Sequence, residues 1–246
     1  MKCEDLKKLR DAFYNNNVVV ITGAGISTLS GILDFRGKNG LYNKNIDAEK
    51  YLSYNFFKEN PLEFYKFYSN YMMINNYKPN FVHTFLCDLE NDGHIKGIIT
   101  QNIDKLHQKA GSKNVVDLHG DGSCFKCIGC NLKYDSSEYL RCSGICPDCG
   151  SYIRPDIILY GEDVAIYNMW KSKSLISSCD ALIVLGSSLV VSTASDLVKE
   201  FIHLKKLKNN LNDKLFIVNN NETPYDYFSN KYEDDLGKVL KKILYF

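Results

Sequence analysis

The stretch VVVITGAGIS, residues 18–27, joins a short apolar segment to a glycine-rich turn. A continuous run of β-branched residues is typical of a strand that is buried on both faces of a parallel sheet. Gly23 and Gly25 let backbone N–H groups approach a pyrophosphate at the N-terminus of a helix, where the helix dipole favours negative charge. We expect Ser27 and Thr28 to open that helix. The stretch therefore predicts the first strand–turn–helix unit of a nucleotide-binding sheet.

The glycine pattern taken alone also fits a tight turn that binds no ligand. The third glycine is Gly31, which gives GxGxxxxxG in place of the usual GxGxxG, and no acidic residue closes a clear second strand. The next stretch, SGILDFRG (residues 30–37), places Asp34, Phe35 and Arg36 in a loop between glycines. Such a loop favours a mobile lid whose arginine and aromatic ring hold a planar, phosphate-bearing ligand. An ion-paired surface loop anchored by its phenylalanine is the alternative.

Strands and helices alternate along most of the chain. Three further apolar runs end in turn residues, namely IKGIIT (95–100), ALIVLG (181–186) and LFIVN (215–219). Helical spacing occurs at 3–15, near 82–91, at 165–178 and at 193–209. This alternation predicts crossover units in an α/β fold, with a Rossmann-like, doubly wound parallel sheet.

Two segments depart from this alternation. Residues 38–78 are rich in aromatic side chains and are expected to form a few helices, whereas residues 120–152 hold most of the cysteines and have little apolar periodicity. A segment with so small a core needs a staple. We therefore expect the two insertions to form one smaller lobe, with a helical part and a metal-binding part. The expected Rossmann-like body comprises residues 1–37, 79–119 and 153–246.

Composition excludes some classes of protein. The chain has 246 residues, 45% of them hydrophobic and 24% charged, and a formal net charge of +1. These values are ordinary for a globular protein and give no electrostatic reason to expect a nucleic-acid or membrane partner. The N-terminus carries acidic residues and no apolar core of a signal peptide, and the run 181–191 is too short to span a bilayer. We expect a cytoplasmic protein whose clustered cysteines bind metal.

Polar residues gather after the second predicted strand. The segment TQNIDKLHQKAG (100–111) contains Gln101, Asn102 and Asp104, and an isolated LHG follows with His119. The carboxyl ends of parallel strands form the ligand-binding edge of an open sheet, so these side chains can converge there. His119 is then a candidate general base, although a lone histidine is also compatible with a hydrogen-bonded core residue. The other four histidines lie in helical or turn contexts.

Six of the nine cysteines lie between Cys124 and Cys149, and their spacing predicts a metal site. Two Cys-x2-Cys pairs with fifteen residues between them, 127/130 and 146/149, match a tetrahedral zinc ribbon. Cys124 with Cys127 is an alternative first pair, and Cys142 is an alternative partner. Four thiolates leave no open coordination position, so the zinc would be structural. A nucleic-acid-binding ribbon would need interleaved basic and aromatic residues, which this segment lacks.

The third strand ends in a second glycine turn, GSSLVVSTA (186–194). Gly186 is followed by Ser187 and Ser188, whose hydroxyl and N–H groups suit ribose or phosphate contacts. Asn219, at the end of LFIVN, is a further candidate ribose ligand. Ordinary helix capping explains each of these residues equally well when it is taken alone.

Taken together and in order, these segments resemble the sirtuins, the NAD-dependent protein deacylases. The matching segments are GAGIS…SGILDFR, TQNIDKLHQKAG, LHG, CIGC…CPDC, IRPDIILYGE (153–162), LGSSLVV and IVNNNET (217–223). They span roughly residues 22–223. The resemblance places the first zinc cysteine eight residues after the catalytic histidine, which selects Cys127, Cys130, Cys146 and Cys149.

The resemblance also implies site residues. His119 would be the general base on a ribose hydroxyl, and Asn102 would be a second catalytic residue. Gln101–Asp104 would line the nicotinamide pocket, and Asp235 would lie near the adenine. The residues implied to bind NAD are Gly23, Ala24, Gly25, Thr28, Asp34, Phe35, Arg36, Gln101, Asn102, Ile103, Asp104, His119, Gly186, Ser187, Ser188, Asn219 and Asp235.

The implied reaction is NAD-dependent removal of an acyl group from a protein lysine, which gives nicotinamide, O-acyl-ADP-ribose and free lysine. An acetylated protein or peptide would pair as an added strand, with its acyl-lysine in a tunnel walled by Ile158 and Tyr160. The region FYKFYSNYM (64–72) lacks the arginine of sirtuins that prefer acidic acyl groups, so we expect a neutral acyl group. Protein mono-ADP-ribosylation is the alternative activity, and a non-catalytic NAD-binding scaffold is a third.

Three residues depart from the family pattern. Leu33 stands where proline is usual, Lys105 where glycine is usual, and Asp121 where serine is common. The lysine puts the local turn in question and adds a cation on the nicotinamide side.

Overall fold

The computed structural model describes residues 3–15, 17–35, 40, 46–74, 76–207 and 214–244. Its main sheet has six parallel strands in the order β3-β2-β1-β7-β8-β9. The strands are β1 (Val18–Thr22), β2 (Ile95–Thr100), β3 (Val115–Asp117), β7 (Ala181–Leu185), β8 (Leu215–Val218) and β9 (Asn230–Tyr232). Strand order reverses at β1, so the doubly wound sheet has its switch point between β1 and β7.

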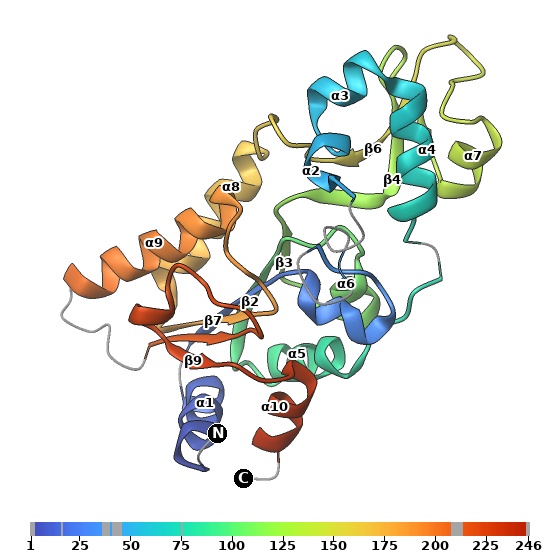
Figure 1. The fold of residues 1–246 in the computed structure, drawn as a ribbon. Helices are drawn as coiled ribbons and strands as arrows, with labels where there is room; N and C mark the ends of the chain where they lie inside the picture. The colour runs from blue at the N-terminus through green and yellow to red at the C-terminus, as the bar shows by residue number, and fades with distance from the viewer. Residues whose placement is uncertain are drawn as a thin grey trace.

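Two layers of helices cover the sheet (Figure 1). Helices α1 (Cys3–Asn15), α5 (Phe81–Asn91) and α10 (Leu236–Ile243) pack on one face, and α8 (Ile166–Ser178) and α9 (Ser192–Leu207) pack on the other. A hydrophobic core lies on each face of the sheet, and alternate residues of β1 point into one or the other. Val18 and Val20 pack in the core beneath α1, α5 and α10, and Val19 and Ile21 pack in the core beneath α8 and α9. This double burial explains why the fully buried strands β1, β7 and β8 have almost entirely apolar sequences.

The turn after β1 differs from the expectation in one respect. Ser27 and Thr28 do not open a helix but lie inside a 3₁₀ helix, η1 (Ala24–Ser30). Backbone bonds from Gly23 N to Leu185 O (3.1 Å) and from Gly25 N to Gly186 O hold the turn against the end of β7. The helix therefore begins within the glycine turn, and Ser27 becomes buried.

A smaller lobe is built on a three-stranded antiparallel sheet of order β5-β4-β6. Its elements are α2 (Ala48–Tyr51), α3 (Tyr54–Glu59), α4 (Pro61–Tyr71), β4 (Gly120–Cys127), β5 (Lys133–Tyr134), α7 (Ser136–Arg141) and β6 (Ile153–Ile157). Two short helices complete the described elements, α6 (Leu106–Ala110) after β2 and η3 (Asp226–Phe228) before β9.

Aromatic side chains join the helical part of the lobe to the cysteine-containing part. Tyr68 of α4 packs edge-on against Phe125 of β4, with ring centroids 6.0 Å apart. Phe125 in turn stacks on Tyr139 of α7 at 4.2 Å. All three rings are fully buried, so the two insertions share one core. The domain limits at residues 37/38, 78/79, 119/120 and 152/153 stay predictions; β6, which follows residue 152, pairs with β4 of the lobe sheet.

Across the described ranges, no helix combines the length and the apolar character needed to cross a membrane.

Candidate active site

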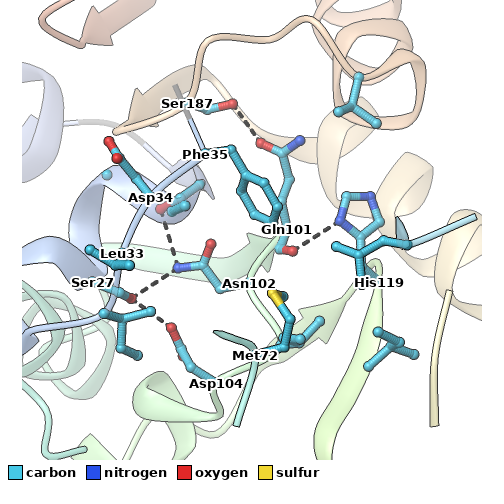
Figure 2. A pocket seen from close by; sticks show the side chains of 18 of the residues that line it. Ser27, Leu33, Asp34, Phe35, Met72, Gln101, Asn102, Asp104, His119 and Ser187 are labelled. Atoms are coloured by element: carbon cyan, nitrogen blue, oxygen red, sulfur yellow. Dashed lines mark hydrogen bonds between the residues drawn. The ribbon is translucent and has the colours of Figure 1, made fainter. Parts of the chain in front are cut away.

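A cavity of about 450 Å³ lies over the carboxyl ends of β1, β2 and β7, between the main sheet and the smaller lobe. Its lining brings together segments that are far apart in the sequence (Figure 2). The predicted site residues among its walls are Gly23, Ala24, Gly25, Asp34, Phe35, Gln101, Asn102, Ile103, Asp104, His119, Ile158, Tyr160, Gly186, Ser187, Ser188 and Asn219. The cavity therefore unites the glycine turns, the polar loop after β2, and Ile158 and Tyr160, the residues expected to wall a substrate tunnel.

Three glycines allow the two strand ends to touch at the switch point. A Cβ atom on Gly23 would lie 2.7 Å from Gly186 O, and one on Gly25 would lie 2.8 Å from Gly186 Cα. Gly186 has φ 62°, in the left-handed region that favours glycine. Backbone atoms thus line this part of the cavity, which suits close approach of a pyrophosphate.

A buried polar network forms the floor of the cavity. Asn102 Nδ2 donates to Ser27 Oγ (3.1 Å) and to Gly23 O (3.2 Å). Ser27 Oγ donates to Asp104 Oδ2 at 2.6 Å, so the serine lies between the amide and the carboxylate (Figure 2). The other carboxylate oxygen accepts from Leu106 N at 2.9 Å, at the start of α6. These bonds fix the directions of the amide and carboxylate that face the cavity.

His119 is held through both ring nitrogens. Nδ1 lies 2.9 Å from Gln101 O, and Nε2 lies 3.1 Å from Thr193 Oγ1. A carbonyl oxygen can only accept, so Nδ1 carries the proton and the neutral ring has its lone pair on Nε2. Burial lowers the pKa of His119, and the bond to Gln101 opposes this only in part. The imidazole is therefore neutral near pH 7 and has the properties of a general base.

The tunnel residues lie on an extended segment that links the two parts of the molecule. Ile158 N donates to His119 O (2.9 Å), and Tyr160 N donates to Leu52 O (2.9 Å). Tyr54 N donates back to Tyr160 O. This pairing places the segment directly beside the histidine backbone, and it ties the tunnel wall to the helical part of the lobe.

A charged pair closes the loop that follows the tunnel segment. The two terminal nitrogens of the Arg154 guanidinium, Nη1 and Nη2, each donate to one carboxylate oxygen of Glu162 at 2.7 Å. Leu159 N donates to the same carboxylate. Burial raises the pKa of Glu162, but the Arg154 guanidinium and the bond from Leu159 N together outweigh this effect and hold the pKa below its usual range. A bidentate pair of this kind fixes the loop in one geometry.

A smaller pocket of about 190 Å³ adjoins the main cavity, with which it shares Gly25, Asp34 and Asn219. Thr28 and Asp235 line this second pocket. Asp235 also caps α10, because its Oδ1 accepts from Lys238 N at 2.9 Å. Among the predicted cofactor residues, Arg36 alone lies outside the described residues.

Sequence reasoning missed several residues of the site. Ser27 was expected only at a helix start, yet it bridges Asn102 and Asp104. Thr193 holds His119, and its place in the segment 186–194 was the available signal. Met72 and Met73 line the cavity from the end of α4, where helical periodicity gave no indication of a site.

Four cysteines form a separate cluster in the smaller lobe. The Sγ atoms of Cys127, Cys130, Cys146 and Cys149 all lie within 4.8 Å of one another. The 127–149 and 130–146 Sγ pairs are 3.4 and 3.6 Å apart, close to the roughly 3.8 Å edge of a tetrahedron with zinc–sulfur bonds of about 2.3 Å. Backbone N–H groups of Gly129 and Cys130 point at Cys127 Sγ. The donor set fits one structural zinc ion and excludes Cys124 and Cys142.

The parallel sheet, the glycine turn at its switch point and the cavity above it define a Rossmann-like protein of the dinucleotide-binding class. Residues 23–193 match the model of the Sir2 family. The chain belongs to this family.

Relatives of known name cover the whole chain. An NAD-dependent protein deacetylase of Staphylococcus epidermidis is 41% identical, over 99% of this chain and 98% of that protein. One of Thermotoga maritima is 41% identical, over 97% of each. Among solved structures, a Sir2 variant with deacetylated p53 peptide and 3'-O-acetyl-ADP-ribose has a TM-score of 0.89 at 37% identity, covering 98% and 97% of the two chains. A Sir2 complex with p53 peptide and NAD⁺ has 0.86 at 37%, covering 100% and 98%.

Proposed function

We infer that this chain is an NAD-dependent protein deacetylase, which removes acetyl or other neutral acyl groups from lysine side chains. The observation that carries this conclusion is that one cavity is lined by the glycine turns, by His119 and by the tunnel residues. A nucleotide and an acyl-lysine can therefore meet at the imidazole. Membership of the Sir2 family and the names of the relatives point to the same activity.

The residues at the switch point fit NAD. A Cβ atom at Gly23 or Gly25 would fill the space beside Gly186, so only bare backbone fits here, as a pyrophosphate requires. Gly23, Ala24 and Gly25 would contact the diphosphate, with Ser187, Ser188 and Asn219 toward the adenosine. Thr28 and Asp235 would lie at the adenine end, in the adjoining pocket. NAD, when bound, supplies a glycosidic bond whose cleavage releases nicotinamide and leaves ADP-ribose to accept the acyl group.

His119 would act as a general base through Nε2. Its Nδ1–H bond to Gln101 O fixes the tautomer and directs the Nε2 lone pair away from the backbone. Thr193 Oγ1 lies 3.1 Å from that nitrogen. A ribose hydroxyl would either replace the threonine at Nε2 or pass its proton to Nε2 through the threonine hydroxyl. The lowered pKa keeps the imidazole ready to take a proton at neutral pH.

The floor of the cavity would bind the nicotinamide side. Asn102 and Asp104 are buried and are held by Ser27, so their remaining polar atoms are fixed before a ligand arrives. Ile103 adds an apolar wall beside them, and Asp34 and Phe35 also line the cavity. A rigid site of this kind excludes water and orients its ligand, which is where much of the rate enhancement of such enzymes arises.

The acyl-lysine would enter between the main sheet and the smaller lobe. Ile158 and Tyr160 would wall its tunnel, and Met72 and Met73 supply flexible apolar surface inside the cavity. No arginine occurs in residues 64–72, and Lys66, the cation of this stretch, is exposed and does not line the cavity, so no positive side chain of this stretch faces the acyl group. The expected substrate is an acetylated, or otherwise neutrally acylated, protein or peptide.

Zinc would be held by the four clustered cysteines and would have a structural role. A site of four thiolates has no open position for a substrate, and its ligands come from two turns of the lobe. We also propose a cytoplasmic location. All nine cysteines are described and are free thiols, and four of them need to stay reduced to bind metal.

The activity is tested with NAD and an acetyl-lysine peptide. We expect NAD-dependent loss of acetyl with release of nicotinamide, and a fall in rate of roughly 10²- to 10⁴-fold for His119→Ala with NAD binding retained. The matched control is His203→Ala on α9, whose side chain is exposed, and it should keep full activity. Label from NAD fixed on protein without deacetylation would instead identify an ADP-ribosyltransferase, and binding without nicotinamide release would identify a scaffold.

A further inference from the structure

Lys105 occupies an unfavourable backbone position between the cavity floor and α6. It has φ 60° and ψ 19°, in the left-handed region, and its side chain makes no capping bond to the helix. A residue with a Cβ atom is strained in this region, whereas glycine is not. The preceding residue, Asp104, is buried in the cavity floor. A lysine at this point therefore needs a compensating contact from its side chain.

The ammonium group of Lys105 lies between two carboxylates. Nζ is 2.7 Å from Asp117 Oδ2 and 3.8 Å from Asp121 Oδ2. The three side chains are 24%, 19% and 28% exposed, so solvent screens the charges only in part. Gln108 Nε2 also donates to both oxygens of Asp117, and Ser123 donates from N and Oγ to Asp121 Oδ1. Both aspartates are thus fixed, with the lysine as the cation between them.

The two aspartates lie on either side of His119. Asp117 ends β3 and Asp121 lies in β4, each two residues from the histidine. The lysine belongs to the loop that follows β2. Its ion pairs therefore connect this loop to both sides of the turn that carries the imidazole. Asp121, which departs from the family pattern at a separate place in the sequence, meets Lys105 here.

Alternate residues of the loop after β2 bond to different partners. Gln101 O accepts from His119 Nδ1, and Ile103 O accepts from Gly122 N at 2.9 Å. Lys105 adds the third contact on the side of the histidine turn, and it is the charged one. The residues between them, at 102 and 104, bond instead to Ser27 of η1. The loop is thus anchored on one side to the glycine turn and on the other to the histidine turn.

We propose that Lys105 is a positioning residue for His119, which draws together the two aspartates around the histidine and so fixes the imidazole relative to the cavity floor. Without the ammonium group, two fixed carboxylates lie close together with no cation between them, and their repulsion opens the turn. The Gln101 bond that sets the tautomer is then strained. The effect on turnover rests on the proposed deacetylase activity, whereas the effect on the imidazole does not.

Charge and backbone strain are separated by three substitutions. Lys105→Met keeps the length and the left-handed strain but removes the charge, Lys105→Arg keeps the charge, and Lys105→Gly removes both strain and charge. We expect kcat for deacetylation to fall about tenfold in the Met and Gly variants, with the KM for NAD within about twofold of the original, and to stay within about twofold in the Arg variant. The Gly variant serves in place of Met if the latter does not fold.

The matched control is Lys199→Met, because Lys199 makes an ion pair of the same length, 2.7 Å, with Asp196 on the exposed face of α9. We expect its kcat to be unchanged. In the Lys105→Met background, Asp121→Asn removes one of the opposed charges and should recover part of the lost kcat.

The side chain of His119 gives a readout that needs no turnover. In ring-nitrogen NMR spectra we expect the Nδ1–H tautomer in the original protein and in Lys105→Arg, and a mixed or broadened signal in Lys105→Met. This result would stand even if the protein failed to deacetylate peptides, so the two proposals can fail separately. Unchanged kcat and unchanged ring signals in Lys105→Met, or an Arg variant as impaired as the Met variant, would overturn the positioning role.

Discussion

The main sheet and the cysteine-bearing lobe are held together by different forces. Every residue of β1, β7 and β8 is buried between two layers of helices, and each apolar side chain so buried contributes on the order of 1.5–3 kcal/mol. The lobe sheet has strands of mixed exposure, and two of its four clustered cysteines are exposed. The sheet is stable through apolar burial between two helix layers, whereas the lobe combines an aromatic core with a cysteine cluster whose metal would join its two cysteine turns.

The largest expected effect comes from removing zinc. Binding at such sites supplies roughly 10–16 kcal/mol that is coupled to folding, so the lobe should unfold while the main sheet stays intact. We expect one zinc per chain by elemental analysis. After chelation, hydrogen exchange should become fast in β4 and α7 and stay slow in β1 and β7, with loss of deacetylation.

Single cysteine substitutions provide the control for this experiment. Cys146→Ser should lose the metal, whereas Cys124→Ser, outside the cluster, should keep it. Deacetylation that survives complete loss of zinc in a folded protein would refute the scaffold role of the metal.

Acid should act on the main sheet and the helices around it, because the buried His83 and His107 lie on α5 and α6, whereas the helices and strands of the lobe contain no histidine. Burial lowers the pKa of His83 to about 4, with a partial offset from Asp104. Burial, and then the neighbouring His83, lowers that of His107 to about 3. Below pH 6.5 these histidines become protonated in the unfolded chain, whereas in the folded chain they stay neutral until the pH approaches 4. The free energy of unfolding therefore decreases as the pH falls from 6.5 toward 4.

His83 and His107 together are expected to cost roughly 3 kcal/mol of unfolding free energy between pH 7.5 and pH 5.5, about half from each, and the lowered pKa of His119 adds to this loss in the same window. Urea denaturation at the two pH values in the presence of zinc measures it. His83→Gln keeps a side chain suited to the capping position and should remove about half of the roughly 3 kcal/mol that His83 and His107 contribute. His203→Gln, at an exposed site of α9, is the control that should leave it unchanged. Equal stability at both pH values would contradict the prediction.

The smallest expected effect lies where the two regions meet, at the Arg154–Glu162 pair. Arg154→Gln leaves the Glu162 carboxylate without its bidentate partner and should cost about 2 kcal/mol of stability. The tunnel segment 158–160 should then loosen, so we expect a higher KM for the peptide and little change in the KM for NAD. Steady-state kinetics on both substrates distinguishes these outcomes, and the double variant with Glu162→Gln measures the coupling between the two residues. A change in the KM for NAD alone, with the KM for the peptide unchanged, would show that the Arg154–Glu162 pair does not support the peptide-binding segment.

Sequence patterns predicted four strands of the six-stranded sheet, β1, β2, β7 and β8, because an apolar run is a local signal; the three-residue strands β3 and β9 form no such run. The strands at 18–22 and 181–185 are apolar runs, the strand at 95–100 is interrupted by Lys96 and Gly97, and each ends where it meets glycine or polar residues. The metal cluster was also legible, since Cys-x2-Cys spacing is itself a local constraint. The spacing alone left Cys124 and Cys142 as alternatives, which the resemblance to a family resolved and the geometry of the sulfur atoms excludes.

Contacts between distant segments could not be predicted in the same way. Ser27 was expected at the start of a helix, but contact between the glycine turn and β7 shifts the helix start to Ala24. The partnership of Thr193 with His119 spans 74 positions, and no periodicity links the two. Lys105 and Asp121 were noticed separately as unusual residues, and only the fold shows that their side chains meet.

The two outer strands of the main sheet are short, and this bears on how copies of the chain behave when concentrated. Each of β3 and β9 has three residues, whereas the central β1 and β2 have five and six. A strand from another chain could form only a few backbone hydrogen bonds with either edge strand, too few for a continuous ladder between two molecules. The apolar strands β1, β7 and β8 lie inside the sheet, so their backbone groups are not accessible to other chains. Exposed on their own, segments of this composition would be prone to form fibrils.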